Sequence, residues 1–264
     1  MTQPCVDLSG NTALVTGATG YLGQAICRSL GECGARVLVN GRKASAVTAF
    51  VETLGTEGLR AEPAIFDIQD REAVSAYVEK RGERPLDILV NNAYAGSGGT
   101  IETATPEAFH AALDIGVVAA QNLLQVHLPA LRKSASRQGS ASVINVVSMY
   151  GLVSPDLRLY ASKNGSNPPF YGAVKAALTQ FTRYAACEFG KEGIRVNAVA
   201  PGPFPAHSVQ EGDPDFVKRL SERVPMGRIG QAHEIGGPVS FLASAAASYI
   251  NGAVLSVDGG WTAW

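Results

Sequence analysis

The chain has 264 residues, of which 46% are hydrophobic and 17% charged, and its formal net charge is -1. This length and composition suit one large α/β domain or two small ones, with a sizeable core. The near-neutral charge lacks the basic field that binding to nucleic acid or to an anionic membrane would need, so we expect neither partner.

Short apolar runs alternate with longer helical patterns along the chain. Each run is nearly all apolar, as expected of strands that are covered on both faces. The runs span residues 13–16, 36–40, 61–66, 86–91, 142–147, 194–198 and 254–257. The helical patterns span residues 22–33, 44–54, 71–80, 106–132, 171–190 and 235–245. This alternation predicts a single domain, residues 1–264, with a Rossmann-type doubly wound parallel sheet of about seven strands flanked by helices.

A glycine-rich loop follows the first predicted strand, with Gly17, Gly20 and Gly23 at intervals of three. Glycines permit a sharp turn and let the backbone approach a pyrophosphate closely. The helix that follows presents free N–H groups to an anion. The loop could be a plain glycine-rich turn, but its place in a β-α-β pattern favours a dinucleotide site.

The end of the second predicted strand indicates which dinucleotide binds. Folds that select NAD usually carry an acidic residue there, which binds the ribose. This chain has Asn40 instead, followed by Arg42 and Lys43. Because a guanidinium matches phosphate geometry, Arg42 favours NADP, while NAD remains possible. The alternative is that both cations are solvated residues at the start of a helix.

Tyr171 and Lys175 are four residues apart in a helical pattern, which places them on one face. A phenol normally titrates near pH ~10, but a nearby ammonium favours the phenolate and lowers the pKa. The pair could therefore form a general acid/base. The spacing alone is a weak signal, because a half-buried tyrosine beside a solvated lysine is the ordinary case.

Several motifs, in order, resemble those of the short-chain dehydrogenase/reductase family from about residue 8 onward. They are the glycine loop, Asn91-Asn92-Ala93-Tyr94, the strand that ends at Ser148, Tyr171-Gly-Ala-Val-Lys175, Pro201-Gly202 and Val257-Asp-Gly-Gly260. The resemblance implies an NAD(P)(H)-dependent oxidoreductase that interconverts a carbonyl and an alcohol by hydride transfer. Its substrate would be a small ketone, alcohol or sugar derivative, and a homodimer or homotetramer is expected by analogy.

The resemblance also assigns roles to residues. Tyr171 would be the general acid/base, Lys175 would lower its pKa and hold the nicotinamide ribose, and Ser148 would bind the substrate oxygen. The implied cofactor-binding residues are Gly17, Thr19, Gly20, Tyr21, Leu22, Asn40, Arg42, Asp67, Ile68, Asn92, Ala93, Tyr171, Lys175, Pro201, Gly202 and Pro203.

Two departures from the family pattern leave other functions open. The spacing of the glycines resembles the branch that includes nucleotide-sugar enzymes, so a nucleotide-sugar-modifying enzyme with tightly held NAD is one alternative. Gly116 stands where many members carry an active-site asparagine, which also allows a non-catalytic, dinucleotide-sensing protein. A glycine inside a helix is unfavourable, so we expect a bend there or room for a water.

The segment between Ser148 and Tyr171 is longer than in most members, and residues 154–170 are rich in Pro, Asn, Ser and Gly. We interpret 154–170 as an inserted active-site loop that shapes substrate specificity. It contains a second Tyr/Lys pair, Tyr160 and Lys163, whose spacing is three, so Tyr171 is preferred.

Phe204, His207 and Met226 follow Gly202 in the chain, and each of them has two interpretations. His207 either touches substrate or is solvated, and Phe204 and Met226 either line an apolar pocket or belong to the core.

The N-terminal residues have neither the basic nor the apolar segment of a signal peptide. No apolar run reaches the ~18 residues of a membrane span. The cysteines, Cys5, Cys27, Cys33 and Cys187, have no metal-site spacing and predict thiols in a reducing compartment. We therefore expect a cytoplasmic protein without a metal.

Overall fold

The strands form one parallel sheet. A computed structural model describes residues 6–96, 98–162 and 165–264, so Cys5 and Lys163 lie outside the described residues. Within these ranges the sheet has seven strands in the order β3-β2-β1-β4-β5-β6-β7. Their bounds are β1 Thr12–Val15, β2 Arg36–Gly41, β3 Ala61–Ile65, β4 Ile88–Asn91, β5 Ala141–Val146, β6 Ile194–Pro201 and β7 Val254–Val257. The order reverses between β1 and β4, which confirms the predicted doubly wound fold.

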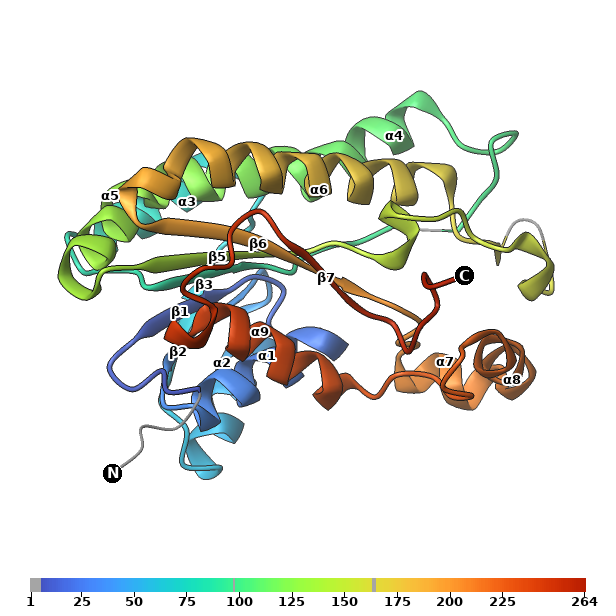
Figure 1. The fold of residues 1–264 in the computed structure, drawn as a ribbon, viewed down its shortest axis with the longest axis horizontal. Coiled ribbons are helices and arrows are strands. Elements are labelled where there is room, and N and C mark those ends of the chain that lie inside the picture. Colours follow the sequence, from blue (N-terminus) through green and yellow to red (C-terminus); the bar gives the residue numbers. More distant parts are fainter. Residues whose placement is uncertain (1–5, 97, 163–164) are drawn as a thin grey trace.

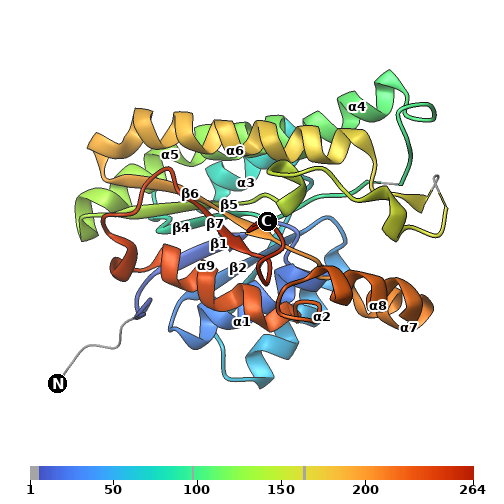
Figure 2. The ribbon, with the colours of Figure 1, turned by 45° about the vertical axis from the view of Figure 1, so that its right-hand side comes forward.

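Helices cover both faces of this sheet (Figure 1). On one side lie α3 (Arg71–Arg81), α4 (Pro106–Leu113), α5 (Ala119–Gln138) and α6 (Pro169–Phe189). On the other side lie α1 (Tyr21–Glu32), α2 (Ala44–Thr56) and α9 (Gly236–Ala243). Two further helices, α7 (His207–Gly212) and α8 (Pro214–Arg223), follow the carboxyl end of β6 and lie together at one end of the molecule (Figure 2).

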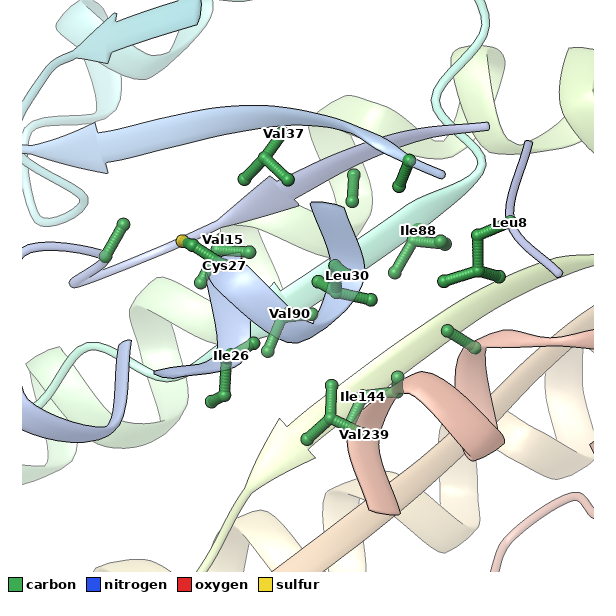
Figure 3. Close-up of a cluster of buried hydrophobic side chains, with 14 of the residues drawn as sticks. Leu8, Val15, Ile26, Cys27, Leu30, Val37, Ile88, Val90, Ile144 and Val239 are labelled. Atoms are coloured by element: carbon green, nitrogen blue, oxygen red, sulfur yellow. The ribbon is translucent and has the colours of Figure 1, made fainter. Parts of the chain in front are cut away.

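Successive residues of each strand point to opposite faces, so the sheet contributes to two cores. Val15 and Val90 pack with Ile26, Leu30 and Val239 between the sheet and helices α1 and α9 (Figure 3). Their neighbours in the sequence, Leu14 and Leu89, pack on the other face under α5. All these side chains are fully buried. A strand buried on both faces explains why the apolar runs are continuous rather than alternating.

The predicted helix at 106–132 is real but is not a uniform α-helix. A π turn, Asp114–Val118, separates α4 from α5, and the buried Gly116 lies at its centre. A Cβ on Gly116 would lie 2.2 Å from Cγ1 of the fully buried Val174 in α6. The widened turn and the absence of a side chain therefore let this helix approach α6, and π turns are frequent at functional sites.

This continuous helix, Pro106–Gln138, is long and apolar enough to cross a membrane by length and composition, since an 18-residue stretch of it has a mean hydropathy of 1.2. It also fits the description of a core helix, because Leu123, Leu131 and Ala135 pack into the cluster against β4 and β5. Core packing thus accounts for its apolar character, and the helix is weak support for a membrane span.

Candidate active site

The glycine loop after β1 forms one wall of a cavity of about 450 Å³ at the carboxyl ends of the strands. Gly17 adopts φ +60°, and a Cβ there would lie 2.8 Å from Cα of Ala93. Asn92, directly after β4, fixes the loop, because its Nδ2 donates to the carbonyl oxygens of Thr16 (2.9 Å) and Gly17 (3.2 Å). The loop is therefore held tightly where the backbone must approach a ligand.

Helix α1 begins at Tyr21 directly after this loop. Its N-cap, Gly20, has no side chain to bond the N–H groups of the first turn. Free N–H groups at a helix N-terminus that faces a cavity form a site for an anion such as a pyrophosphate. The local geometry thus agrees with the dinucleotide interpretation of the loop.

The far rim of the cavity carries the residues expected to distinguish NADP from NAD. Asn40 is buried, and its amide donates to the carbonyl oxygens of Ala64 and Phe66, so this side chain joins β2 to β3. Arg42 is exposed and lies 3.7 Å from the carboxylate of Asp67 across the rim. The guanidinium is thus free to meet an anion, with only a loose, solvent-screened ion pair to hold it.

Ser148 and Tyr171 are brought together by close packing of backbone on backbone. Ser148 follows β5 and caps a short 3-10 turn, Met149–Gly151, by accepting from the N–H of Tyr150 at 3.1 Å. A Cβ on Gly151 would lie 2.8 Å from the carbonyl carbon of Lys175, and one on Gly172 would lie 2.7 Å from the oxygen of Tyr150. These two glycines let the turn rest directly on the first turns of α6.

Lys175 is enclosed beneath this pair. Only 3% of its surface is exposed, and its Nζ donates to the carbonyl oxygen of Val146 at 2.8 Å. The same Nζ lies 5.7 Å from the ring centroid of Tyr171 and 4.9 Å from that of Tyr94. The lysine therefore belongs to the site rather than to solvent, which rejects the ordinary interpretation of the Tyr/Lys spacing.

Burial governs the titration of both groups. It lowers the pKa of Lys175 to about 8, because the charged ammonium is removed from water. It raises the pKa of Tyr171, and a hydrogen bond with Ser148 offsets this rise only in part. Burial of the phenol is the largest effect on the pKa of Tyr171 in this structure, and the lowering of that pKa by Lys175 stays a prediction.

Gly116 borders a second, small cavity of about 10 Å³ next to Lys175. This volume is near the lower limit for one water, and Oδ1 of Asn91, another lining residue, has no hydrogen-bond partner among the described residues. The expectation of a bend or of room for a water thus has structural support, since Gly116 lies both in the π turn and against this cavity.

Most residues predicted from the sequence share the main cavity. Those on its wall are Gly17, Thr19, Gly20, Tyr21, Leu22, Asn40, Arg42, Asp67, Ile68, Asn92, Ala93, Ser148, Tyr171, Lys175, Pro201 and Gly202. Pro203 lies outside it, in a neighbouring hollow that Phe204 and Met226 also line. His207 is exposed and packs edge-on against the ring of Tyr21, with the centroids 5.1 Å apart, so it covers the glycine loop rather than the catalytic end.

Known proteins are similar to this chain along nearly its whole length. A family model described as enoyl-(acyl carrier protein) reductase matches residues 17–262. The rhamnolipids biosynthesis 3-oxoacyl-[acyl-carrier-protein] reductase of Pseudomonas aeruginosa is 35% identical over 98% of this chain and 99% of its own length. Gluconate 5-dehydrogenase of Gluconobacter oxydans is 33% identical over 97% of this chain and 96% of its own.

A solved structure agrees in three dimensions. The Pseudomonas aeruginosa RhlG/NADP active-site complex superposes with a TM-score of 0.86 at 34% identity, covering 98% of this chain and 99% of that one. The chain belongs to the short-chain dehydrogenase/reductase family. As a short-chain dehydrogenase/reductase it is an oxidoreductase of alcohol and carbonyl groups.

The sequence interpretation of this dehydrogenase/reductase missed one prominent wall residue. Tyr94 lines the cavity and contacts Tyr171 edge-on, with the ring centroids 5.0 Å apart. The signal was present, because an aromatic residue stands in the Asn-Asn-Ala-Tyr motif where the family usually has a glycine. Tyr94 was named only as the last residue of this motif, and no role was assigned to it.

Proposed function

We propose that this chain is an NADP(H)-dependent oxidoreductase in which Ser148, Tyr171 and Lys175 carry out carbonyl–alcohol interconversion. The observation that carries the proposal is the convergence of these three side chains at one end of a cavity whose other end is the glycine loop. A site of this shape can hold a dinucleotide along the cavity and a small substrate against Ser148 and Tyr171.

When bound, NADP supplies or accepts the hydride at the substrate carbon. In reduction, the phenol of Tyr171 donates its proton to the substrate oxygen as the carbonyl becomes an alcohol, and in oxidation the phenolate takes that proton back. Ser148 donates a hydrogen bond to the same oxygen and stabilises its developing charge. Lys175 places a cation beneath Tyr171 and favours its deprotonated form.

The residues present fit a dinucleotide with a 2′-phosphate. The uncapped N-terminus of α1 suits the pyrophosphate, and the exposed guanidinium of Arg42 on the rim suits the phosphate on the ribose. The described part of β2 contains no acidic residue of the kind that binds the ribose of NAD. NADP is therefore the preferred cofactor, in agreement with the bound NADP of the Pseudomonas aeruginosa relative.

A substrate panel tests the proposal directly. Purified protein is mixed with NADPH or NADH and with simple ketones, 3-oxoacyl thioesters and keto-sugar acids, and loss of nicotinamide absorbance is followed. We expect turnover of at least one carbonyl class, faster with NADPH. Cofactor binding with no turnover of any carbonyl or alcohol would instead support a dinucleotide-sensing protein.

We further propose that residues 154–170 are an insertion within a single domain and that they select the substrate. Leu159 and Tyr160 belong to an apolar cluster with Leu220 and Phe216 of α8. Nε of Arg219 donates to the carbonyl oxygen of Leu159 at 2.7 Å. The same cluster includes Tyr171, so the insertion and α8 form one cover over the catalytic end.

Two leucines of one short turn test this role of the insertion. Leu159 is buried against α8, whereas Leu157 is 59% exposed. We expect Leu159→Ala to loosen the cover and change KM and the relative rates across the panel several-fold, with Leu157→Ala as the matched control. Equal substrate profiles for the two variants would contradict the proposal.

We also propose a cytoplasmic homodimer or homotetramer. Cys27, Cys33 and Cys187 are free thiols, as suits a reducing compartment. Several apolar side chains on the α4–α6 side are exposed, among them Val118 (44%) and Tyr184 (66%), and a partner subunit could cover them. Light scattering on the purified protein measures the mass, and a monomer at micromolar concentration would contradict the assembly.

A further inference from the structure

Tyr94 touches both members of the catalytic pair. Nζ of Lys175 lies 4.9 Å from the centroid of its ring, over the ring face, and the rings of Tyr94 and Tyr171 form a T-shaped contact with an interplanar angle of 74°. The phenol hydroxyl is buried and has no hydrogen-bond partner among the described residues. Burial, with a smaller contribution from Tyr171, raises the pKa of Tyr94 to about 12, so this ring stays neutral at physiological pH.

The ammonium of Lys175 has few other partners. It has three N–H donors, of which one bonds to the carbonyl oxygen of Val146. With 3% of the residue exposed, bulk water reaches this ammonium only to a small extent. Across the described ranges no carboxylate forms an ion pair with Lys175, and Asp114, the acid of the adjoining π turn, is exposed. The titratable groups that face the ammonium are therefore the phenols of Tyr94 and Tyr171.

Gly116 leaves the space beside this ring open. A Cβ at Gly116 would lie 3.7 Å from Cε2 of Tyr94 and would collide with Val174. A longer side chain at this position would therefore compete with Val174 and with the ring. Because of the glycine and the π turn, the ring face of Tyr94 lies beside Lys175, where a longer residue at position 116 would place its side chain.

We propose that Tyr94 is a positioning residue whose ring face holds the ammonium of Lys175 and keeps it charged beside Tyr171. An aromatic face attracts a cation through its quadrupole, and the attraction is strongest where water is excluded. The proposal rests on the roles proposed above for Tyr171 and Lys175. Without the ring, Lys175 would lose its proton at lower pH and would support the phenolate less well.

The direct test is an NMR titration of Lys175 in protein with isotope-labelled lysine, with Lys175→Met used to assign the signal. We expect Tyr94→Leu to lower the pKa of Lys175 by about one unit, because the ring face is lost while the apolar volume is largely kept. Tyr94→Phe keeps the ring face and serves as the matched control, with a midpoint close to that of the wild type. An unchanged midpoint in Tyr94→Leu would overturn the proposal.

A second series covers the case in which the leucine variant does not fold. Phenylalanine analogues with increasing fluorination at position 94 weaken the quadrupole while nearly keeping the shape of the ring. A stepwise fall in the Lys175 midpoint supports the proposal, and a flat series overturns it. Because neither titration needs turnover, failure of this proposal is distinguishable from failure of the proposed function, which the substrate panel decides.

Kinetics add a readout that a purely structural role would not move. In the oxidation direction the phenolate of Tyr171 is the active form, so kcat/KM rises with pH as the phenol loses its proton. We expect this rise to shift to higher pH in Tyr94→Leu but not in Tyr94→Phe. Equal shifts in both variants would contradict the role of the ring face.

Discussion

At the scale of single residues, burial shifts the pKa values of the two members of the catalytic pair, Tyr171 and Lys175, in opposite directions. Burial alone would make Tyr171 a poorer acid/base, since it raises the pKa of the phenol. Burial also lowers the pKa of Lys175 to about 8, which still leaves the ammonium mostly charged at neutral pH. The site therefore needs contacts that keep Lys175 cationic, such as those with the Val146 carbonyl and the Tyr94 ring.

Arg42 gives a prediction about cofactor choice. Its guanidinium is 64% exposed and paired only loosely with Asp67, so truncation should cost little stability. We expect Arg42→Ala to weaken NADP binding about 10- to 100-fold, the usual worth of a charge-assisted hydrogen bond, and to leave NAD binding nearly unchanged. Calorimetric titration with each cofactor measures this difference.

The neighbouring cation is the control for Arg42. Lys43 is also exposed and opens α2. We expect Lys43→Ala to change NADP binding by a few-fold at most. Equal losses of NADP and NAD affinity in Arg42→Ala would contradict the assignment of the 2′-phosphate to this residue.

At the scale of elements, the π turn in the long helix is the feature that most depends on one residue. Because Val174 is fully buried, it cannot swing away from a Cβ at Gly116. We expect Gly116→Ala to lower the free energy of unfolding by about 1–3 kcal/mol through overpacking. Urea denaturation measures the loss.

Two further variants separate this clash from the general effect of replacing a helical glycine. Val174→Ala removes Cγ1, so the double variant should recover much of the loss caused by Gly116→Ala. A methyl group on Gly55 in α2 would meet no atom of the described residues within 4 Å, so Gly55→Ala should be neutral or slightly stabilising. Additive losses in the double variant would show that the contact with Val174 is not the cause.

Much of this architecture was predictable, because buried parallel strands leave continuous apolar runs and because i, i+4 spacing fixes a shared helix face. Helix α8 was missed although Asp213 before Pro214 is a good helix start, and the side chain of Asp213 does cap the N–H of Phe216 at 2.9 Å. The π turn could not be predicted, because the apolar pattern continues through it without a break. Contacts such as Tyr94 with Lys175 depend on how β4 and α6 meet in space.

At the scale of the whole molecule, His127 links stability to pH. It is fully buried in α5, its Nδ1 bonds to the carbonyl oxygen of Leu123 at 2.8 Å, and burial lowers its pKa to about 4. The unfolded chain binds a proton at this residue below pH ~6.5, whereas the folded chain does so only near pH 4. Stability should therefore fall as the pH drops through this window, by roughly 3 kcal/mol at most.

A pair of histidine variants isolates this contribution. His127→Leu should flatten the pH dependence of the unfolding free energy between pH ~6.5 and ~4, because the titrating group is gone from both states. His110 is exposed in α4, and His110→Gln should leave the dependence unchanged. Urea denaturation across this range checks both, and an unchanged slope in His127→Leu would contradict the assignment.

The measurement that tests the central claim most directly is the kcat/KM of Tyr171→Phe, taken together with its affinity for NADPH. The control is Tyr160→Phe, which removes the hydroxyl of the nearby insertion tyrosine that bonds to Tyr150 at 3.2 Å. We predict a loss of about 10²- to 10⁴-fold for Tyr171→Phe with NADPH binding retained, and a change of a few-fold at most for Tyr160→Phe. Full activity in Tyr171→Phe would contradict the account.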